Sequence, residues 1–452
     1  MLNAREALNR LRLPYFKHKR YLTGIDWLVQ ALDAMTRRAT GIGNLSQIVL
    51  ELEGSPNEAR LRGALEAFLS KFPVVRGYTT RCINLAPYWK IPAAEGGAPA
   101  ALRVHDLAPG WAMADVLALL ERGVNRPFEG KREHLAFRLV RAGETSWLAM
   151  AFDHRLFDAW GAEAFLNEFQ REWETGAGAS QPADLPEPAH LSRWGDKFEA
   201  GKRLNRSLLE LSVDASPCGL PLPSGEGGAG LFRFRTAAFD ERETAAITET
   251  AYREAGYLMA MPWAAAVSAR VLHRLFTQRG VGAGDVMMSV SIDMRPAEKR
   301  LRDVFFNHLS FLLFRIGASA MDDFPGVVIE VKRQMYEQVK SGFPGNLRET
   351  CFLMRIAPLP LMGWVMRAYL KGRLASFCFS HVSESAYSST RLMDWRVRNL
   401  FHMPRVPAPP GVGIFFNRRQ GRLNATLSYL EGLMSEEEAD GLMRDLTAGM
   451  GV

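Results

Sequence analysis

The sequence predicts an α+β protein of two similar units, each a mixed sheet with flanking helices, and three observations support this. The chain has 452 residues, which exceeds one ordinary domain and favours two domains of roughly 200 residues each. Its two halves repeat the same coarse order of helix, strands and flanking helix. Residues 176–230 are rich in Gly, Ala, Ser and Pro around one helical insert, which is typical of a linker. We therefore expect an N-terminal lobe at 1–175 and a C-terminal lobe at 231–452.

The composition is that of an ordinary soluble globular protein, with 47% hydrophobic and 23% charged residues. The cysteines, Cys82, Cys218, Cys351 and Cys378, form no Cys-x-x-Cys pair and have no histidine at zinc spacing. This argues against a disulfide scaffold or a structural metal and fits a reducing cytosol. The longest uncharged run, 255–269, is too short to span a bilayer, and the N-terminus lacks the apolar core of a signal peptide. We therefore expect a cytoplasmic protein.

The chain is basic, with a net charge of +7, which suits polyanions such as nucleic acid, anionic lipid, an acidic carrier protein or a phosphorylated cofactor. The basic residues are scattered, apart from modest clusters at 10–20 and 299–302. No nucleic-acid motif and no stripe of aromatics interleaved with Lys and Arg is present, so we expect no nucleic-acid partner. Most of this charge is interpreted as a solvated surface.

Hydrophobic periodicity predicts the elements of the N-terminal half. Residues 1–40 are predicted to be helical, and Gly41 and Gly43 end that helix. A half-buried strand follows at 48–53, where apolar and polar side chains alternate. The remaining predictions are a helix that opens at Ser55-Pro56, an extended segment from Pro73, and short strands at 87–89 and 102–104.

The most informative stretch is 146–161, an apolar strand that runs into His154, a tight turn and Asp158. A second strand at 135–141 precedes it, and turn residues between the two predict a hairpin. Apolar residues at helical spacing predict a helix at 162–173. His154 therefore lies where a strand ends and a helix begins, a place where a side chain is fixed yet reachable.

A single His-x-x-x-Asp pattern has two interpretations. In the first, His154 is a turn histidine and Asp158 caps the following helix. In the second, the pair belongs to a functional site. The second is favoured because no other of the nine histidines has an Asp at this spacing, and because of the motifs that follow in the second half.

The linker and the C-terminal half contain further elements, beginning with a helical insert at 198–211. The strand at 286–292 is notable because it leads directly into Asp293-Met294-Arg295-Pro296. The other predicted elements are a strand at 231–235, helices from Asp240 and at 262–276, strands at 307–314 and 376–382, a hairpin of 411–417 with 423–429, and a helix at 435–448.

Four markers in order give the chain a resemblance to a known family. Residues 64–76 resemble its first helix with a Pro-x-hydrophobic-Arg exit, 154–158 its His-His-x-x-x-Asp-Gly motif, 291–296 its strand ending in Arg-Pro with Asn307 as the following Asn, and 411–438 its terminal hairpin and last helix. The family is the CoA-dependent acyltransferase superfamily, which includes chloramphenicol acetyltransferase, plant BAHD acyltransferases, wax ester synthases, alcohol acetyltransferases and the condensation domains of nonribosomal peptide synthetases.

The chain departs from the family pattern at three places. Asp153 stands where the first His of the doublet is usual, and Ala159 stands where Gly follows the Asp. Ser380-His381 falls where condensation domains often carry Ser-Asn.

The resemblance implies two chloramphenicol-acetyltransferase-like lobes with the site between them. It implies acyl transfer from a thioester to a hydroxyl or amine, with acyl-CoA or a phosphopantetheine thioester as co-substrate, and with neither a bound cofactor nor a metal. An alcohol needs a positioned base near neutral pH, and an ordinary His, with a pKa of about 6.5, suits that task. By resemblance His154 is that base, while Asp158 and Arg295 form a structural clamp that holds its loop.

The oxyanion of the tetrahedral intermediate needs hydrogen-bond donors. The backbone amides of Trp160 and Gly161 are candidates because they begin a helix, and Asn307, Ser380 and His381 are further candidates. Each of the last three also has a structural interpretation: Asn307 as a strand cap, Ser380 as a strand residue, and His381 as a satisfied core histidine.

The partners implied are an acyl thioester donor, a small-molecule acceptor and, as an alternative donor source, an acyl carrier protein. Met259, Met261 and Trp263 either line a substrate channel or belong to the core. The segment 353–370, followed by basic residues, is either a packed helix, which we favour, or a membrane-surface contact. The alternatives to a CoA-dependent enzyme are a free-standing condensation enzyme with a carrier-bound donor and a non-catalytic binding relative.

Overall fold

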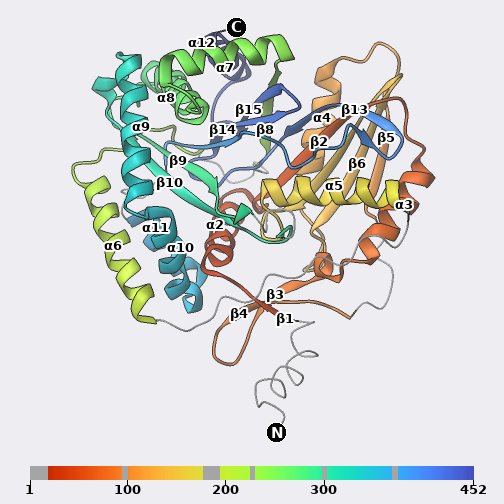
Figure 1. The fold of residues 1–452 in the computed structure, drawn as a ribbon, viewed down its shortest axis with the longest axis horizontal. Coiled ribbons are helices and arrows are strands. Elements are labelled where there is room, and N and C mark those ends of the chain that lie inside the picture. The colour runs from red at the N-terminus through yellow and green to blue at the C-terminus, as the bar shows by residue number, and fades with distance from the viewer. Residues whose placement is uncertain are drawn as a thin grey trace.

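The computed structural model describes residues 19–93, 100–176, 194–223, 230–297, 303–368 and 375–451. The described residues form two six-stranded sheets and one three-stranded sheet, with helices packed around them (Figure 1). Both large sheets contain parallel and antiparallel pairs. The predicted α+β architecture of two lobes, each a mixed sheet with flanking helices, is therefore confirmed.

The N-terminal sheet carries the predicted hairpin. In spatial order it comprises β12 (Arg391–Leu392), β13 (Trp395–His402), β2 (Leu45–Glu53), β7 (Thr145–Asp153), β6 (Leu135–Ala142) and β5 (Leu102–Asp106). β6 and β7 pair antiparallel up to Ala142 and Thr145. Gly143 has a φ of 62° in the turn between them, a left-handed conformation that favours glycine. The hairpin prediction is confirmed, and β7 ends one residue before His154.

Both faces of this sheet are covered by other elements. Successive residues of β2 and β7 point to opposite faces, and this explains why residues on both faces of these strands are apolar. Ile48, Leu50 and Met150 pack with α3 (Glu58–Ser70) and α5 (Ala159–Thr175). Val49 and Ala149 belong to the cluster that includes the side chains of α4 (Met113–Val124). A strand buried on both faces is held in register by two cores, so the end of β7 is a rigid platform for His154.

The C-terminal sheet faces the N-terminal sheet across the middle of the molecule (Figure 1). It comprises, in order, β10 (Leu309–Ile316), β9 (Val286–Asp293), β11 (Phe377–Val382), β14 (Val412–Arg419), β15 (Arg422–Leu430) and β8 (Phe232–Ala238). Its helices are α7 (Glu241–Ala255), α8 (Ala260–Gln278), α9 (Phe324–Lys340) and α12 (Glu436–Gly449). Asp240 and Ser435 each form a capping box that starts a helix. The predicted strands, hairpin and helices of this half are present.

Four helices from distant parts of the chain pack together beside the two sheets. They are α2 (Gly24–Thr40), α6 (Trp194–Ser212), α10 (Phe343–Leu353) and α11 (Leu359–Ala368). α10 packs against both α2 and α6, and α11 packs against α2. α6 is the helical insert that was predicted at 198–211. This insert therefore does not stand apart as a linker element but forms part of the wall between the lobes.

The C-terminal half also contributes to the N-terminal sheet. β13 pairs antiparallel with β2 from His402 opposite Ile48 to Val397 opposite Leu52. The chain then returns to the C-terminal sheet at β14. The strands of the N-terminal sheet therefore do not all come from residues 1–175, because this crossover adds residues 391–402 to that sheet. The exact lobe boundaries remain a prediction.

Three local features differ from the sequence prediction. The helix expected over 1–40 begins at Gly24, where Thr23 and Asp26 form a capping box, and residues 1–18 lie outside the described residues. β1 (Lys19–Tyr21) instead joins β4 (Pro87–Lys90) and β3 (Tyr78–Arg81) in the small sheet. Pro73 is followed by one 3-10 turn before β3. α4 was missed, although Val116, Leu120 and Val124 recur at helical spacing and are fully buried.

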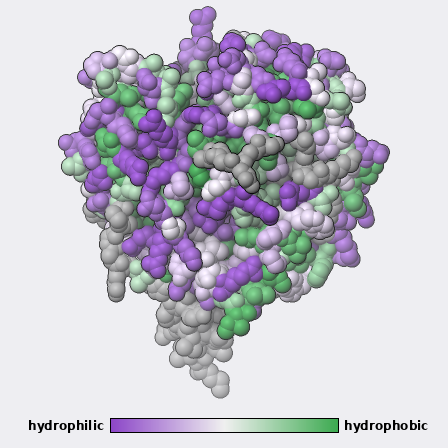
Figure 2. All heavy atoms as spheres, turned by 180° about the vertical axis from the view of Figure 1, so that it is seen from behind, coloured by the Kyte–Doolittle hydropathy of each residue, from purple (hydrophilic) through white to green (hydrophobic). Residues whose placement is uncertain are grey.

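Figure 2 shows polar residues over most of one face, with hydrophobic residues in small groups between them. None of the described helices is long and apolar enough to cross a membrane. Within the described ranges, no three His, Cys, Asp or Glu side chains are placed to hold a metal ion together.

Candidate active site

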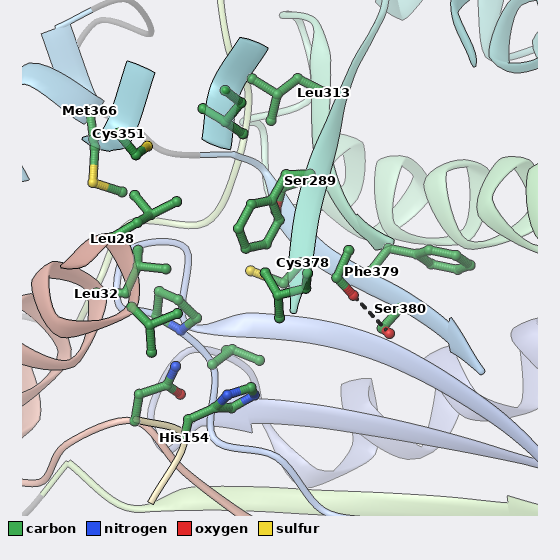
Figure 3. A pocket seen from close by; sticks show the side chains of 18 of the residues that line it. Leu28, Leu32, His154, Ser289, Leu313, Cys351, Met366, Cys378, Phe379 and Ser380 are labelled. Atoms are coloured by element: carbon green, nitrogen blue, oxygen red, sulfur yellow. Dashed lines mark hydrogen bonds between the residues drawn. The ribbon is translucent and has the colours of Figure 1, made fainter. Parts of the chain in front are cut away.

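His154 lies in the turn between β7 and α5, and both its backbone N–H and its backbone carbonyl are hydrogen-bonded. Its N–H donates to Asn44 O at 3.3 Å, and its carbonyl oxygen accepts from Asn307 Nδ2 at 2.9 Å. Its side chain lines a cavity of about 470 Å³ and projects into it (Figure 3). The turn thus presents a backbone-fixed imidazole to a space large enough for a small-molecule ligand.

The imidazole of His154 has no carboxylate that orients it. Its Nδ1 is buried and has no hydrogen-bond partner among the described residues. Asp158, four residues later, bonds elsewhere. The arrangement therefore differs from a Ser-His-Asp triad, in which a carboxylate accepts from Nδ1, and it leaves Nε2 as the nitrogen that can serve a ligand in the cavity.

Asp158 is fully occupied by three donors. Its Oδ1 accepts from Gly161 N at 2.9 Å and from Arg295 Nη2 at 2.7 Å, and its Oδ2 accepts from His308 N at 2.9 Å. Burial is the largest single influence and would raise the pKa of Asp158, but the charge and hydrogen bond of Arg295 together with His308 outweigh it and hold the pKa below its usual value. Asp158 thus both caps α5 and joins it to the C-terminal lobe. Both sequence interpretations, cap and ion pair, describe parts of this geometry.

Arg295 connects the end of β9 to the same turn. Besides Asp158, it donates from Nη1 to Asp293 Oδ1 at 3.0 Å and from Nε to Asp303 O at 2.9 Å. The segment that follows is locked to the His154 turn by Phe306 N, which donates to Leu156 O at 2.6 Å. The structure therefore brings His154, Asp158, Arg295 and the 303–308 segment together.

Asp153, at the position where the family pattern has its first His, is a buried ion-pairing residue. It accepts from His134 Nδ1 at 2.9 Å and from the backbone N–H of Arg155 at 2.9 Å. Burial would raise the pKa of Asp153, but Arg155 and His134 together hold it well below its usual range. His134 also donates from Nε2 to Gly77 O at 2.7 Å. Through these bonds Asp153 fixes the end of β7, next to His154.

Two of the candidate oxyanion donors prove to have structural bonds. The Gly161 amide donates to Asp158, so it is not free for an oxyanion. A Cβ at Gly161 would lie 2.1 Å from Val304 O, so only glycine allows this close approach. Asn307 donates from Nδ2 to the His154 carbonyl, which makes it a support of the turn, while its strand-cap and oxyanion interpretations stay predictions. Trp160 packs against the N-terminal core, and its amide remains only a prediction.

Ser380 and His381 lie on opposite faces of β11. Ser380 lines the cavity and accepts from Ser291 Oγ at 2.9 Å (Figure 3). His381 instead has its ring 5.9 Å from the ring of Phe416, and burial lowers its pKa to about 4. His381 is therefore neutral at ordinary pH. Its side chain is half-buried by accessible surface, and it lies away from the cavity because side chains alternate along a strand and that of Ser380 takes the cavity face. That it is a core histidine stays a prediction.

Met259, Met261 and Trp263 do not form a channel. Trp263 is 1% exposed within the core of the C-terminal lobe, and the two methionines pack against that core. The core interpretation is therefore confirmed for these residues. The segment 353–370 contributes differently: Met354 near its start and Met362, Val365 and Met366 of α11 line the cavity. Its residues 369–370, and the basic residues that follow up to 374, lie outside the described residues, so the membrane contact remains untested.

Two cavity-lining residues were not anticipated. The His402 Nε2 donates to Glu163 Oε1 at 2.6 Å, and Glu163 is fully buried. Arg405 is also buried, and it donates to the neutral oxygens of Thr40 and Gly43 at 2.9 and 3.2 Å. Burial lowers the pKa of Arg405 to about 9. No local pattern marks these residues, because Glu163, Thr40 and Gly43 lie more than 200 residues away from them in the sequence.

The cavity lies between the two sheets and beside the four packed helices. Asn44, Ser46 and His154 line it from the N-terminal sheet and its turns, and Ser289, Ser291 and Ser380 line it from the C-terminal sheet. Cys351 and Cys378 also line it, and burial raises the pKa of their thiols to about 12 and about 11. Both thiols are therefore protonated near neutral pH and are poor nucleophiles.

Solved structures that this chain resembles include an acetyltransferase and several condensation domains. The chain matches trichothecene 15-O-acetyltransferase from Fusarium sporotrichioides with a TM-score of 0.68 and 11% identity, covering 96% of this chain and 95% of that one. It matches the first condensation domain of the calcium-dependent antibiotic synthetase with a TM-score of 0.68 and 18% identity, again over 96% and 95%. The starter condensation domain of rhizomide synthetase, solved with C8-CoA and Leu-SNAC, matches with a TM-score of 0.64 and 13% identity over 96% and 94%.

These matches define the class of fold: the chain has the same two-lobed architecture as the acetyltransferase and the condensation domains named above. No protein-family model and no curated protein matches the sequence. At these identities the likeness shows the fold alone, and the chemistry has to be argued from the site.

Proposed function

We propose that the protein is an acyltransferase that moves an acyl group from a thioester, acyl-CoA or acyl carrier protein, to a hydroxyl or amine. The observation that carries this proposal is the placement of His154. Its ring enters a cavity between the lobes, while its backbone is bonded on one side to Asn44 and on the other to Asn307. The enzymes and condensation domains named above share the fold, which supports this choice of reaction.

The transfer needs one proton acceptor in the proposed mechanism. The Nε2 of His154 takes the proton of the acceptor as its oxygen or nitrogen attacks the thioester carbonyl carbon. The tetrahedral intermediate collapses, the carbon–sulfur bond breaks, and the proton passes from His154 to the departing thiolate. Cys351 and Cys378 take no part, because their protonated thiols do not form an acyl-enzyme. No bound cofactor is required.

The intermediate's oxyanion is stabilised by Ser380 in this proposal. Ser380 Oγ accepts from Ser291 Oγ, which leaves the Ser380 hydroxyl hydrogen to donate toward the cavity. A single lost oxyanion donor costs about 10²–10³-fold in kcat in enzymes that use one. Asp158, Arg295 and Asn307 act as positioning residues, because they bond to the His154 turn and do not line the cavity.

The experiment measures thiol release from a panel of acyl-CoAs mixed with alcohols and amines. Wild type is compared with His154→Ala and with His273→Ala, a control on α8 whose ring bonds to Gly282 O outside the cavity. We expect acceptor-dependent release that falls about 10²–10⁴-fold in His154→Ala and is unchanged in the control. Both variants are first checked by thermal melting and circular dichroism.

Other outcomes point to the alternatives. Release that survives His154→Ala removes His154 from the mechanism. If both proteins are silent with every acyl-CoA, the panel is repeated with acylated carrier protein, where turnover identifies a free-standing condensation enzyme. If no thiol is released from acylated carrier protein either, the proposed catalysis is overturned and a binding role is left for the cavity.

A further inference from the structure

The cavity has two chemically different ends. The end at His154 is polar, with Asn44, Ser291 and Ser380 around the imidazole. The other end lies among α2, α6, α10, α11 and β10, and we call it the apolar arm. It is lined by Leu28, Leu32, Leu204, Leu313, Met362 and Met366. In Figure 3, Leu28, Leu313 and Met366 lie across the cavity from His154 and Ser380.

Few hydrogen-bonding groups are offered by the helices of the apolar arm. Asn205 of α6 and Thr350 of α10 are polar residues that line the cavity. Asn205 is exposed to solvent, and the Thr350 hydroxyl donates to Asn346 O at 2.6 Å within its own helix. The Cys351 thiol beside it stays protonated, because burial raises its pKa to about 12. Water in such a space makes few hydrogen bonds, so an apolar group displaces it favourably. The arm is therefore suited to a ligand segment without polar atoms.

We propose that the apolar arm binds an unbranched aliphatic chain carried by one of the two substrates, and that Gly201 on α6 sets the length of this chain. The inference rests on the proposed acyl transfer, which places the reacting carbonyl at His154. The cavity of about 470 Å³ is within the range of small-molecule sites. The acyl group and the acceptor are the two possible sources of the chain, and binding measurements separate them.

Gly201 lies on the face of α6 that borders the arm. Gly201, Leu204 and Leu208 all line the cavity at a spacing of three and four residues, which places them on one helical face. A Cβ at Gly201 would meet Leu353 Cδ1 at 3.7 Å and Thr350 at 3.9 Å, which is ordinary van der Waals contact. A side chain can therefore be added at position 201 without a backbone clash. A long side chain there would extend into the apolar arm and reduce the length of ligand chain that the arm can hold.

The first test uses ligands that do not react. S-ethyl, S-butyl, S-octyl and S-dodecyl thioethers of CoA are titrated calorimetrically into wild type and into His154→Ala, followed by primary alcohols of the same chain lengths. In one of the two series we expect affinity to rise about fourfold per methylene until the arm is full, the factor for burying one CH₂. A rise among the thioethers assigns the arm to the acyl group, and a rise among the alcohols assigns it to the acceptor. An affinity that does not change with chain length in either series overturns the inference.

The second test changes the length of the arm. Gly201→Leu is expected to weaken the octyl ligand about 16-fold, as if two methylenes were displaced, while leaving the ethyl ligand within twofold. Gly195→Leu is the matched control, because Gly195 is exposed on the same helix and has nothing within 4 Å of its Cβ position. Met366→Ala removes a side chain from the opposite wall and is expected to favour longer chains.

The outcomes separate this inference from the proposed function. Chain-dependent binding without thiol release from any donor keeps the apolar arm and rejects the acyltransferase. Thiol release that is equally fast for acetyl and octanoyl donors and for short and long acceptors keeps the acyltransferase and rejects the arm. Equal effects of Gly201→Leu and Gly195→Leu reject the role of Gly201.

Discussion

His154 and His402 line the same cavity but are held in opposite ways. The ring of His402 is fixed through Nε2 by Glu163, whose other oxygen accepts from Ser385 Oγ and Ala386 N at 2.7 and 2.6 Å. The ring of His154 has no such partner, and its turn is held instead through backbone bonds and the Asp158–Arg295 pair. The comparison teaches that a ring can be positioned without a carboxylate partner: a fixed backbone holds His154 in place and leaves its ring nitrogen available to a substrate.

The largest expected effect comes from breaking the clamp that holds the His154 turn. Asp158→Ala leaves Arg295 buried without this partner, which costs about 3–5 kcal/mol of the free energy of unfolding. Activity is lost with it, because the turn no longer presents His154. Chemical denaturation and thiol release measure the two effects.

The matched control for this prediction is Asp293→Ala. Asp293 also pairs with Arg295, but its side chain is 23% exposed, so its loss is expected to cost much less. An Asp158→Ala protein with normal unfolding and normal turnover would contradict the assignment of the clamp.

A smaller effect is expected from Glu163→Gln, which tests the other half of the comparison. This change removes the charged acceptor of His402, Ser385 and Ala386, and we expect a loss of about 1–3 kcal/mol in the free energy of unfolding. Turnover of the folded protein is expected to stay near the wild-type value. Glu168→Gln on the same helix is the control, because within the described ranges the Glu168 carboxylate pairs with Arg171, whose side chain is 58% exposed. A fall in turnover as large as in His154→Ala would make His402 the base.

The smallest stability effect is expected from Asn307→Ala, which removes one hydrogen bond to the His154 carbonyl. The cost is about 0.5–1.5 kcal/mol, yet kcat should fall further than this loss of stability explains, because His154 is less well positioned. Asn424→Ala is the control for kcat: its Nδ2 donates to Leu400 O at 3.0 Å, the same kind of bond away from the cavity, and its amide also exchanges two hydrogen bonds with Asn399, so its stability cost is expected to be larger. Equal kcat values in the two variants would remove Asn307 from the positioning of His154.

Elements with a strong local pattern were predictable from the sequence. The β6–β7 hairpin, α5 and the β14–β15 hairpin all carry periodic apolar residues bounded by turn or capping residues, and the structure has them within a few residues of the predicted ranges. The β12–β13 crossover was not predictable, because pairing of β13 with β2 joins residues more than 340 positions apart. The placement of these strands depends on long-range contacts that no local pattern encodes.

The sequence by itself determined the fold class, the hairpin that leads into His154 and the order of the motifs around it. Only the tertiary structure decided how those residues are used. It gave the Gly161 amide to Asp158, gave Asn307 to the His154 carbonyl and turned His381 away from the cavity. It also brought His402 to Glu163 and built the apolar arm from four distant helices. The physical reason is that periodicity reports which face of an element is buried, whereas hydrogen-bond partners and cavities arise only when elements from distant parts of the chain pack together.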